Sequence, residues 1–379
     1  MKKILLTMCF FASIAISAQK EFVSTGGGEW HLPATWNTVD GGANNLNETP
    51  GINDNVTITT NTVTVGVGQT ALCNNLTVNG STNARYIQVK ETGKLTINGN
   101  FITTRSQDGM RINYTNSPAT KDSGTIIING FTTSDGTTAT SRRAYINKRV
   151  PSTNWHLISV GGTNSRQNEL ASSGSNIVVN GTKNIYAVGA YNGNNAAGSK
   201  YEYISSSSTY ANSVAFAKVG YAVKVTDADV NLNLRPVIVY ADASEDISDA
   251  GDGFNLVGNP HFSYLHANTA AHATDNLLAV NSGVLEEQTI WLWDAANSQF
   301  NSINLGDATA LRIHPFQGFF VKAKSGGGTT QSFQYTKVMR SHDKQGDFLR
   351  SANNRFEIDL SIVSGDLTRK SSIRYIDNM

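Results

Sequence analysis

The chain has 379 residues, of which 30 are Lys or Arg, 29 are Asp or Glu, and 16% carry a charge. A formal net charge of +1 provides no electrostatic footprint for nucleic acid or an anionic membrane, so the composition disfavours polyanionic partners. The abundance of Gly, Asn, Ser and Thr suits strands joined by polar turns better than helices.

The first eighteen residues predict a secretory signal peptide. Lys2-Lys3 precede an apolar run over residues 4–16 and the small pair Ser17-Ala18. We expect cleavage between Ala18 and Gln19, with a cut after Ser17 as the alternative. The run is shorter than the roughly 20 residues that span a membrane, so a retained anchor is the weaker interpretation, and no later segment predicts a span.

Removal of the signal peptide changes both the charge and the cysteine content. Lys2-Lys3 leave, so 28 basic residues face 29 acidic ones. Cys9 leaves as well, and Cys73 then has no partner for an internal disulfide. Stability must therefore come from burial and backbone pairing.

Trp30 and Trp36 stand six residues apart in a segment that precedes the first regular strands. A stack of strands exposes unpaired edges at its end and needs a cap. We interpret both tryptophans as aromatic plugs of such a cap, and a sugar-stacking platform is the alternative that stays open.

Residues 55–105 form short runs that alternate apolar and polar side chains, as half-buried strands do. Similar units begin at Asn55, Asn75 and Lys94, and Thr125 begins a looser copy. Steps of about 20 residues predict the coils of a solenoid, and a parallel β-helix fits better than a leucine-rich repeat. The β-helix places four side chains inward: Leu76, Val78, Leu95 and Ile97.

The second half predicts antiparallel strands with long loops. Leu256-Val257 ends at a Gly-Asn-Pro turn, and 319–321 resembles a central strand. Trp291 and Trp293 are two positions apart and share one strand face. The fold class is therefore all-β: a short N-terminal parallel β-helix followed by an antiparallel β-sandwich-like domain, with a short helix over 274–280. The predicted divisions are 1–18 for the signal peptide, 19–135 for the capped β-helix, 136–345 for the β-sandwich-like domain and 346–379 for the start of a further β-domain.

These segments resemble the large exported proteins of bacteria that use type IX secretion. The N-terminal likeness lies in Trp30, Thr35-Trp36, Pro50, residues 54–58, residues 73–78 and residues 95–97. The middle-domain landmarks are residues 145–151, 155–159, 220–224, 254–260, 290–294 and 317–321. Val160 and His261 depart from the family, which often has Pro and Tyr there. The resemblance implies an N-terminal β-helical region, an encounter with the export machinery, and an extracellular or outer-surface destination.

The end of the chain predicts an incomplete domain. Residues 355–362 alternate as a strand, and residues 372–376 look like its partner. Two strands alone are marginally stable. The resemblance implies a further β-domain and a C-terminal sorting domain after this point, so we expect a fragment or a truncated gene product.

Candidate chemical sites are sparse. His261, His266 and His272, near Asp275, lack the spacing of a helical zinc motif, and a solvated polar loop explains them more simply than a metal site. Asp242, Glu245, Asp246, Asp249 and Asp252 are weak calcium candidates that an exposed acidic loop explains more simply. The basic group Arg142, Arg143, Lys148 and Arg149 predicts a solvated strand, because alternation splits it over two faces. We assign no metal or other cofactor.

No catalytic motif is recognised, because the coils offer only Lys90, Glu91 and Lys94 as charges and no facing carboxylate pair. We expect a non-catalytic surface or secreted protein for adhesion or glycan binding, to a polysaccharide or a host or cell-surface glycan. The aromatic candidates for glycan contact are Trp30, Trp36, Tyr201, Tyr203 and Tyr210. A structural stalk is the alternative, and a polysaccharide-degrading β-helix enzyme is the second alternative.

Overall fold

The computed structural model describes residues 19–38, 42–43, 47–59, 61–79, 86–103, 107–112, 123–133, 143–161, 165, 170, 176–205, 218–326, 330–344, 357–364 and 367–374. The expected signal peptide with its cleavage site at Ala18, and the candidates Arg142 and Tyr210, lie outside these residues or at their border. Within them the protein is all-β, as predicted from the sequence, and its one α-helix is the short α1 (Leu277–Val280).

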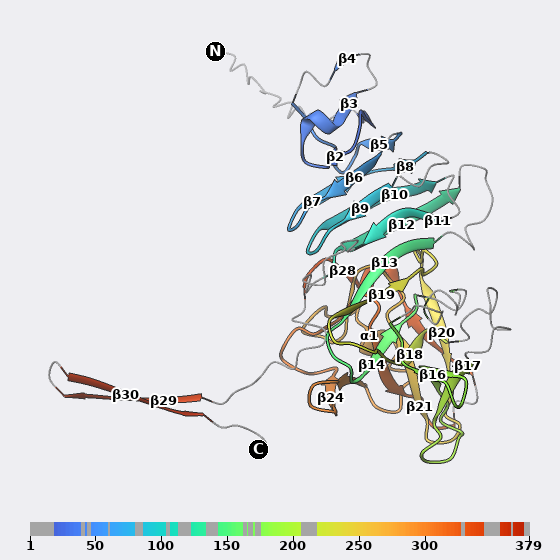
Figure 1. Ribbon diagram of the computed structural model, residues 1–379, viewed down its shortest axis with the longest axis vertical. Coiled ribbons are helices and arrows are strands. Elements are labelled where there is room, and N and C mark those ends of the chain that lie inside the picture. The colour runs from blue at the N-terminus through green and yellow to red at the C-terminus, as the bar shows by residue number, and fades with distance from the viewer. Residues whose placement is uncertain are drawn as a thin grey trace, which may run out of the picture.

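Two sheets occupy the N-terminal part of the molecule (Figure 1). Sheet A contains β1 (Glu21–Ser24), β3 (Trp36–Thr38), β4 (Gly42–Ala43), β5 (Asn55–Ile58), β7 (Thr70–Cys73), β8 (Leu76–Val78), β10 (Lys94–Thr103) and β12 (Thr125–Thr133). Sheet B contains β2 (Gly28–Glu29), β6 (Thr62–Val65), β9 (Tyr86–Val89), β11 (Gln107–Ile112), β13 (Arg143–Val150) and β19 (Val230–Leu234).

The chain alternates between these two sheets, and the strands that it adds to each sheet in turn pair in parallel. In sheet A, β5 pairs with β8, β8 with β10, and β10 with β12. In sheet B, β6 pairs with β9, β9 with β11, and β11 with β13. Strand β13, which the sequence places beyond the boundary at 135, is therefore the last parallel strand of sheet B.

The register of sheet A differs from the predicted spacing. Val56 lies opposite Leu76, as the first two units suggest. Leu76 then lies opposite Phe101, and Leu95 lies opposite Ala71. The unit at Lys94 therefore pairs with β7, because β10 is long enough to lie beside both β7 and β8. The paired positions 56, 76, 101 and 131 are not evenly spaced, so the expectation of coils of about 20 residues was wrong beyond the first step.

Alternation along these strands builds the first core. Leu76, Val78, Leu95 and Ile97 are fully buried, as predicted. Cys73 is also buried and free, and burial together with the nearby Asp54 carboxylate raises the pKa of its thiol. A thiol with a raised pKa is a poor nucleophile, so Cys73 acts as a small core residue. This core continues into the second half through residues such as Val223 and Phe316.

Both ends of the stack are covered. At the N-terminal end, β3 runs antiparallel to β1, and β4 pairs with β3. The short 3-10 helix η1 (Pro33–Thr35) leads into β3. At the other end, β19 runs antiparallel to β13, and the amide of Ile126 donates to the carbonyl of Phe262. The second half thus extends sheet B beyond β13 through β19 and accepts one backbone hydrogen bond from β12, which partly covers the edges there.

Two larger sheets form the lower part of the main body in Figure 1. Sheet C contains β14 (Trp155–Ser159), β15 (Val179–Asn180), β16 (Ile185–Tyr191), β17 (Tyr201–Ser205) and β18 (Gly220–Lys224). Sheet D contains β21 (Phe254–Gly258), β23 (Thr289–Asp294), β24 (Gln299–Asn304) and β26 (Gly318–Lys322). Smaller pairings join β20 (Ala243–Ile247) with β27 (Gln331–Tyr335), β22 (Tyr264–His266) with β25 (Arg312–Ile313) and β28 (Arg340–Ser341), and β29 (Glu357–Ser364) with β30 (Leu367–Arg374); η4 (Lys337–Met339) precedes β28.

Sheet D separates two apolar regions. Strand β26 lies between β21 and β23, so residues 319–321 form a central strand, as predicted. One face, with Phe319 and Val321, packs into a second core with α1. Trp291 and Trp293 share the opposite face, as expected from their spacing. Helix α1 starts at Leu277 rather than Thr274, because the Asn276 side chain caps it by accepting from the amide of Ala279.

Candidate aromatic binding surface

Trp30 and Trp36 are buried, with about 2% and 1% of their surface exposed. Their rings meet edge to face at 5.1 Å, and Trp36 Nε1 donates to the carbonyl of Trp30 at 2.7 Å. A ring that stacks on a sugar must present its face to solvent, so neither tryptophan is a glycan contact in this structure. The interpretation as plugs of the N-terminal cap agrees with their burial.

Exposed aromatic side chains occur elsewhere. Among the Phe, Trp and Tyr side chains of the described residues, two are exposed: Tyr203 at 41% and Phe300 at 48%. Tyr203 lies on β17 of sheet C, and Phe300 lies on β24 of sheet D. Although they come from different sheets, both belong to one continuous group of rings.

We call this group the aromatic cluster. It consists of Trp155, Tyr191, Tyr201, Tyr203, Trp293, Phe300 and Phe320. The ring centroids are 5.9 Å apart for Trp155 and Tyr203, 6.5 Å for Tyr203 and Tyr201, 5.4 Å for Tyr201 and Tyr191, 4.8 Å for Tyr191 and Phe320, 5.6 Å for Phe320 and Phe300, and 4.9 Å for Phe300 and Trp293. The contacts close into a loop, because Trp293 Nε1 donates to the carbonyl of Trp155 at 2.8 Å.

Strand pairing explains how the cluster assembles. Sheets C and D approach closely where glycines lie: a Cβ on Gly220 would come within 2.5 Å of the carbonyl of Val257, and one on Gly318 within 2.9 Å of the backbone of Ile158. Tyr203 lies opposite Gly189, whose missing side chain leaves room for the tyrosine ring. The glycines thus allow the two sheets to contribute rings to one surface.

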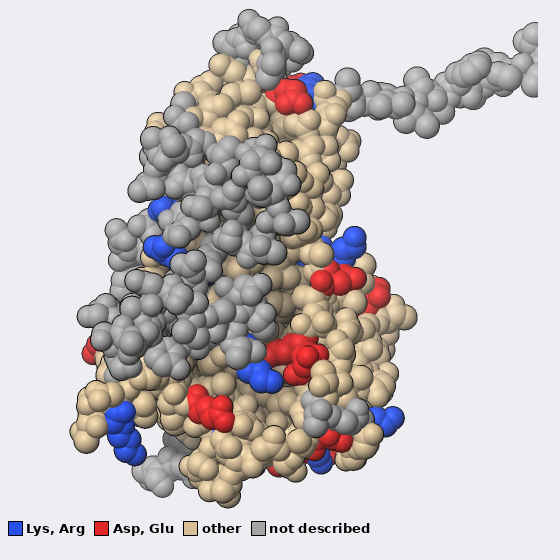
Figure 2. All heavy atoms as spheres, turned by 90° about the vertical axis from the view of Figure 1, so that its right-hand side faces the viewer, with Lys and Arg blue, Asp and Glu red and all other residues tan. Residues whose placement is uncertain are grey.

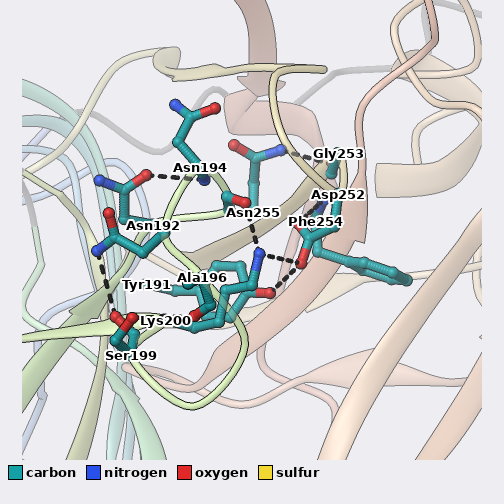
Figure 3. A network of polar contacts seen from close by, with 12 residues as sticks. Tyr191, Asn192, Asn194, Ala196, Ser199, Lys200, Asp252, Gly253, Phe254 and Asn255 are labelled. Atoms are coloured by element: carbon teal, nitrogen blue, oxygen red, sulfur yellow. Dashed lines mark hydrogen bonds and ion pairs between the residues drawn. The ribbon is translucent and has the colours of Figure 1, made fainter.

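A polar network borders the cluster (Figure 3). The hydroxyl of Tyr191 donates to Asp252 Oδ2 at 2.5 Å, and Lys200 Nζ lies 3.1 Å from the same oxygen. In the loop between β16 and β17, Asn192 and Asn195 both donate to Glu202 Oε1. These bonds fix the loop beside the exposed rings.

The charges in this network are set by these contacts. Burial acts to raise the pKa of Asp252, but hydrogen bonds from Tyr191, Phe254 and Lys200 outweigh it, so the pKa lies below its usual value. Burial, followed by the charge of Tyr203, raises the pKa of Tyr201 to about 12. At neutral pH the border therefore carries an ionised carboxylate, and the tyrosines remain neutral donors.

The five acidic candidates for calcium do not come together. Asp242 accepts from the amide of Lys337, Asp249 from that of Gly326, and Asp252 from Tyr191. Glu245 and Asp246 lie on β20, where Glu245 is buried and accepts from the amide of Val219. The expectation of an exposed acidic loop was wrong for Glu245, which is buried on β20, whereas Asp242 and Asp246 are exposed. The described residues contain no group of three His, Cys, Asp or Glu side chains that could hold a metal ion.

The three candidate histidines also separate. His261 is fully buried, and burial, aided by the Arg340 charge, lowers its pKa to about 3. His266 and His272 stack with ring centroids 5.3 Å apart, and His272 lies 3.5 Å from Asp275. His261 is therefore a neutral core residue, so the expectation of a solvated loop was wrong for it, whereas His266 is half-buried and His272 is exposed.

Alternation divides the basic group on β13, as predicted. Arg149 is on the outer face and forms an ion pair with Asp229. Lys148 points inward and is buried, which contradicts the expectation of a solvated strand for this residue. Its Nζ donates to the carbonyl of Pro315 at 3.0 Å, and burial lowers its pKa to about 7.

The Asn side chains of the repeated units serve the fold. Asn55 Oδ1 accepts from Asn74 and Asn75, and Asn75 Oδ1 accepts from the amide of Asn100. This ladder satisfies backbone and amide groups at successive turns. These groups are engaged within the protein, so the rows of Asn are weaker candidates for polymer contact than the aromatic cluster.

Of the seven residues in the aromatic cluster, Tyr201 and Tyr203 were expected from the sequence as glycan contacts. Trp155, Trp293 and Phe300 were not expected in that role, because they lie on strands whose pairing across two sheets is not encoded in local spacing. A signal for them is present in the sequence: aromatic residues at alternate positions, such as Trp291 and Trp293, share one face of a strand. Such a face carries more rings than a small core needs.

Comparisons with known proteins give no further identification. No protein-family model, curated protein or solved structure matches this chain. No helix within the described part of the chain is long and apolar enough to cross a membrane.

Proposed function

We propose that this protein is an exported, non-catalytic surface or secreted protein that binds polysaccharide through the aromatic cluster. One observation supports this proposal above all: the two well-exposed aromatic side chains of the described structure, Tyr203 and Phe300, lie on the same continuous group of rings. Tyrosine and tryptophan present a large apolar face and a polar edge, which suits recognition at a wet surface.

The chemistry of a sugar fits this arrangement. The C–H groups on one face of a pyranose ring stack on an aromatic face, and its hydroxyl groups need polar partners at the edges. Aromatic faces come from Tyr203, Trp155 and Phe300, and polar atoms come from Glu202 and Asn192 beside them. Binding sites of this kind combine apolar faces with a few placed polar groups.

The architecture that we propose is a short capped parallel β-helix built from sheets A and B, followed by an antiparallel β-sandwich-like part built from sheets C and D. The same-direction pairing of successive strands supports the first assignment, and the antiparallel pairing within sheets C and D supports the second. A rigid stack of this kind can carry the aromatic cluster away from the cell.

Export is proposed from the charged, apolar and small-residue pattern over residues 1–18. The resemblance to proteins of type IX secretion extends the proposal to the extracellular space or the outer cell surface. A structural stalk without a ligand is the alternative, and a polysaccharide-degrading enzyme is the second alternative.

The test is binding to a panel of neutral polysaccharides, measured by affinity electrophoresis and by glycan array. Tyr203→Ala and Phe300→Ala should each weaken binding about tenfold, because each removes an exposed face of the cluster. Val67→Ala and Val338→Ala are matched controls, since these side chains are exposed and lie outside the cluster. Thermal unfolding establishes that each variant is folded.

The outcomes separate the three functions. Binding lost in both cluster variants and kept in both controls supports the proposal. Absence of binding to every polymer would favour the stalk. Release of reducing sugar by the wild-type protein would favour the enzyme.

A further inference from the structure

Strand β24 is the outer strand of sheet D, and one of its two long edges has no neighbouring strand among the described residues. The order of sheet D is β21-β26-β23-β24, so β24 pairs with β23 alone. That pairing runs without a bulge from Thr289–Asn304 to Asp294–Gln299. A regular edge strand of this kind is a template to which another strand can add.

The hydrogen-bond pattern of β24 shows which backbone groups point away from β23. The amide of Leu305 donates to the carbonyl of Gln288, at the pair that continues the register beyond Thr289. In an antiparallel ladder, hydrogen-bonded pairs alternate with pairs whose amides and carbonyls point to the opposite side. Phe300 and Ser302 therefore direct their amides and carbonyls toward the open edge.

The open edge of β24 lacks the features that protect edge strands. Charged residues, Pro and bulges usually prevent unwanted pairing. Residues 299–304 contain no Lys, Arg, Asp, Glu or Pro, and residues 299–302 are all exposed. In the view of Figure 2, acidic and basic side chains are scattered over the lower part of the molecule, where sheets C and D lie. The absence of charge is therefore a local property of β24.

The strand is complementary to a second copy of itself. When two copies of β24 run antiparallel about a two-fold axis at Asn301, Phe300 of each copy lies opposite Ser302 of the other. These are the residues with outward backbone groups, so each pair can exchange both of its hydrogen bonds. Asn301 lies opposite Asn301, and a side-chain amide can both donate to and accept from an identical amide.

Charge and area indicate the kind of partner and the strength of its binding. A two-fold axis brings residues near it close to their own copies, so a charge on β24 would meet a like charge, and an uncharged strand avoids this repulsion. Phe300, which is 48% exposed, lies diagonal to its copy, within reach of an aromatic contact. One strand pair buries less than the roughly 1,000 Å² of a stable interface, so the association is weak and depends on concentration.

We propose that two copies of this protein associate through β24, in antiparallel pairing with Asn301 at the two-fold axis. Sheet D of one copy then continues into sheet D of the other. Phe300 of both copies lies on the same face of the joined sheet, so the two aromatic clusters become neighbours. The association does not require the proposed polysaccharide binding, and it is measured without any polymer.

The first experiment is sedimentation equilibrium of the full chain over a range of concentrations. Asn301→Lys and Asn301→Asp each place like charges opposite one another, so we expect self-association at least about tenfold weaker in either variant. A mixture of the two variants should associate again, because opposite charges then meet at the axis. Thr182→Lys is the control, since Thr182 is exposed in the turn after β15, and its association should equal that of the wild type.

The second experiment uses disulfide formation under mild oxidation. Asn301 would form a non-hydrogen-bonded pair with its copy, which places the two Cα atoms about 4.5 Å apart, within the range of a disulfide. Asn301→Cys should therefore give a covalent dimer, whereas the exposed Thr182→Cys should not. The native Cys73 is buried and free, and the wild type measures the background.

Thermal unfolding establishes that each variant is folded. Self-association lost in both charged variants and restored in their mixture supports the proposal, as does a covalent dimer of Asn301→Cys alone. A wild-type chain that stays monomeric at every concentration overturns it and leaves the edge to a strand of a different protein. A mixture that associates no better than either charged variant, or equal cross-linking of the two cysteine variants, also overturns it.

Discussion

The side chains of Thr96 and His342 are 246 positions apart in the chain, and Thr96 Oγ1 lies 2.9 Å from His342 Nε2. The other ring nitrogen, Nδ1, lies 2.8 Å from Thr125 Oγ1. The imidazole therefore bridges hydroxyls on two neighbouring strands of sheet A, β10 and β12. This contact joins a late segment of the second half to the outer face of the first half.

The His342 bridge predicts a specific loss of stability in acid. Burial, followed by the charges of Lys94 and Arg340, lowers the pKa of His342 from 6.5 to about 4. Between these values the unfolded chain binds a proton that the folded chain does not, so stability falls as the pH is lowered. Below both pKa values, protonation of His342 lowers the free energy of unfolding by about 3 kcal/mol.

His342→Gln should therefore show a shallower loss of unfolding free energy between about pH 6.5 and 4, measured by urea denaturation. His261, whose pKa is lowered to about 3, contributes in the same direction and stays in both proteins. Parallel curves for the two proteins would contradict the prediction.

Arg340 lies at the same junction, and its removal should cause a large loss of stability at neutral pH, where His261 and His342 are uncharged. Its Nη1 donates to the carbonyls of Ile128 at 2.6 Å and Tyr240 at 3.3 Å, and its Nη2 donates to Asn129 Oδ1 at 3.0 Å. Arg340→Met leaves these acceptors without their donor, which should cost about 3 kcal/mol of unfolding free energy.

Arg312→Met is the control for Arg340→Met. Arg312 forms one ion pair, at 3.3 Å, with the exposed Asp343, so its loss should change the unfolding free energy by less than about 1 kcal/mol. Equal effects of the two substitutions in urea denaturation would show that Arg340 does not join the two halves.

Glu245 should make the stability of the protein depend on pH in the opposite direction. Burial raises the pKa of this carboxyl from 4.5 to about 7, although the amide of Val219 donates to it. The folded chain thus binds more protons than the unfolded chain between these values, and the stability from this group is present below about pH 4.5 and is lost as the pH rises through 7.

Glu245→Gln keeps an acceptor for the amide of Val219 and does not ionise. As the pH rises from below 4.5 to above 7, we expect the unfolding free energy of the variant to increase by about 3 kcal/mol relative to that of the wild type. The measurement is urea denaturation of both proteins across this range. A difference that stays constant with pH would refute the ionisation of Glu245 in the folded state.

Gly220 lies where sheets C and D are in tight contact, so a larger residue there should destabilise the protein. A Cβ at this position would lie 2.5 Å from the carbonyl oxygen of Val257 and 2.8 Å from that of Leu256. Gly220→Ala must push the sheets apart, at a cost of about 2 kcal/mol. Gly181→Ala is the matched control, since nothing lies within 4 Å of its added carbon.

Both glycine variants are compared by thermal unfolding and by polysaccharide binding. Gly220→Ala should lower the melting temperature and weaken binding by the aromatic cluster, which spans the two sheets, whereas Gly181→Ala should change neither. An unchanged melting temperature in Gly220→Ala would mean that the sheets can separate without cost.

Local patterns in the sequence predicted the strands well, because the alternation of apolar and polar residues reports which side of a strand is buried. Leu76, Val78, Leu95 and Ile97 were assigned inward from this alternation and are fully buried. Residues 357–364 and 367–374 pair as β29 and β30, as the two runs at the C-terminal end suggested. Even the split of Lys148 from Arg149 followed from alternation.

Pairing between distant segments could not be predicted from local patterns in the sequence. The unit at Lys94 resembles the one at Asn75 but pairs with β7, because register depends on how the whole of β10 fits its neighbours. The calcium candidates looked like one acidic run, yet strand geometry directs Glu245 into the core and Asp252 toward Tyr191.

By itself, the sequence determined that this is an all-β chain of alternating strands with a buried aromatic pair near Trp30, since these properties depend on neighbouring residues. The tertiary structure alone decided which side chains meet: Trp155 with Trp293 across two sheets, Arg111 with Tyr86 across two strands, and His342 with Thr96 across the molecule. The physical reason is that surfaces for binding are assembled from strands far apart in sequence, and backbone hydrogen bonds set their register.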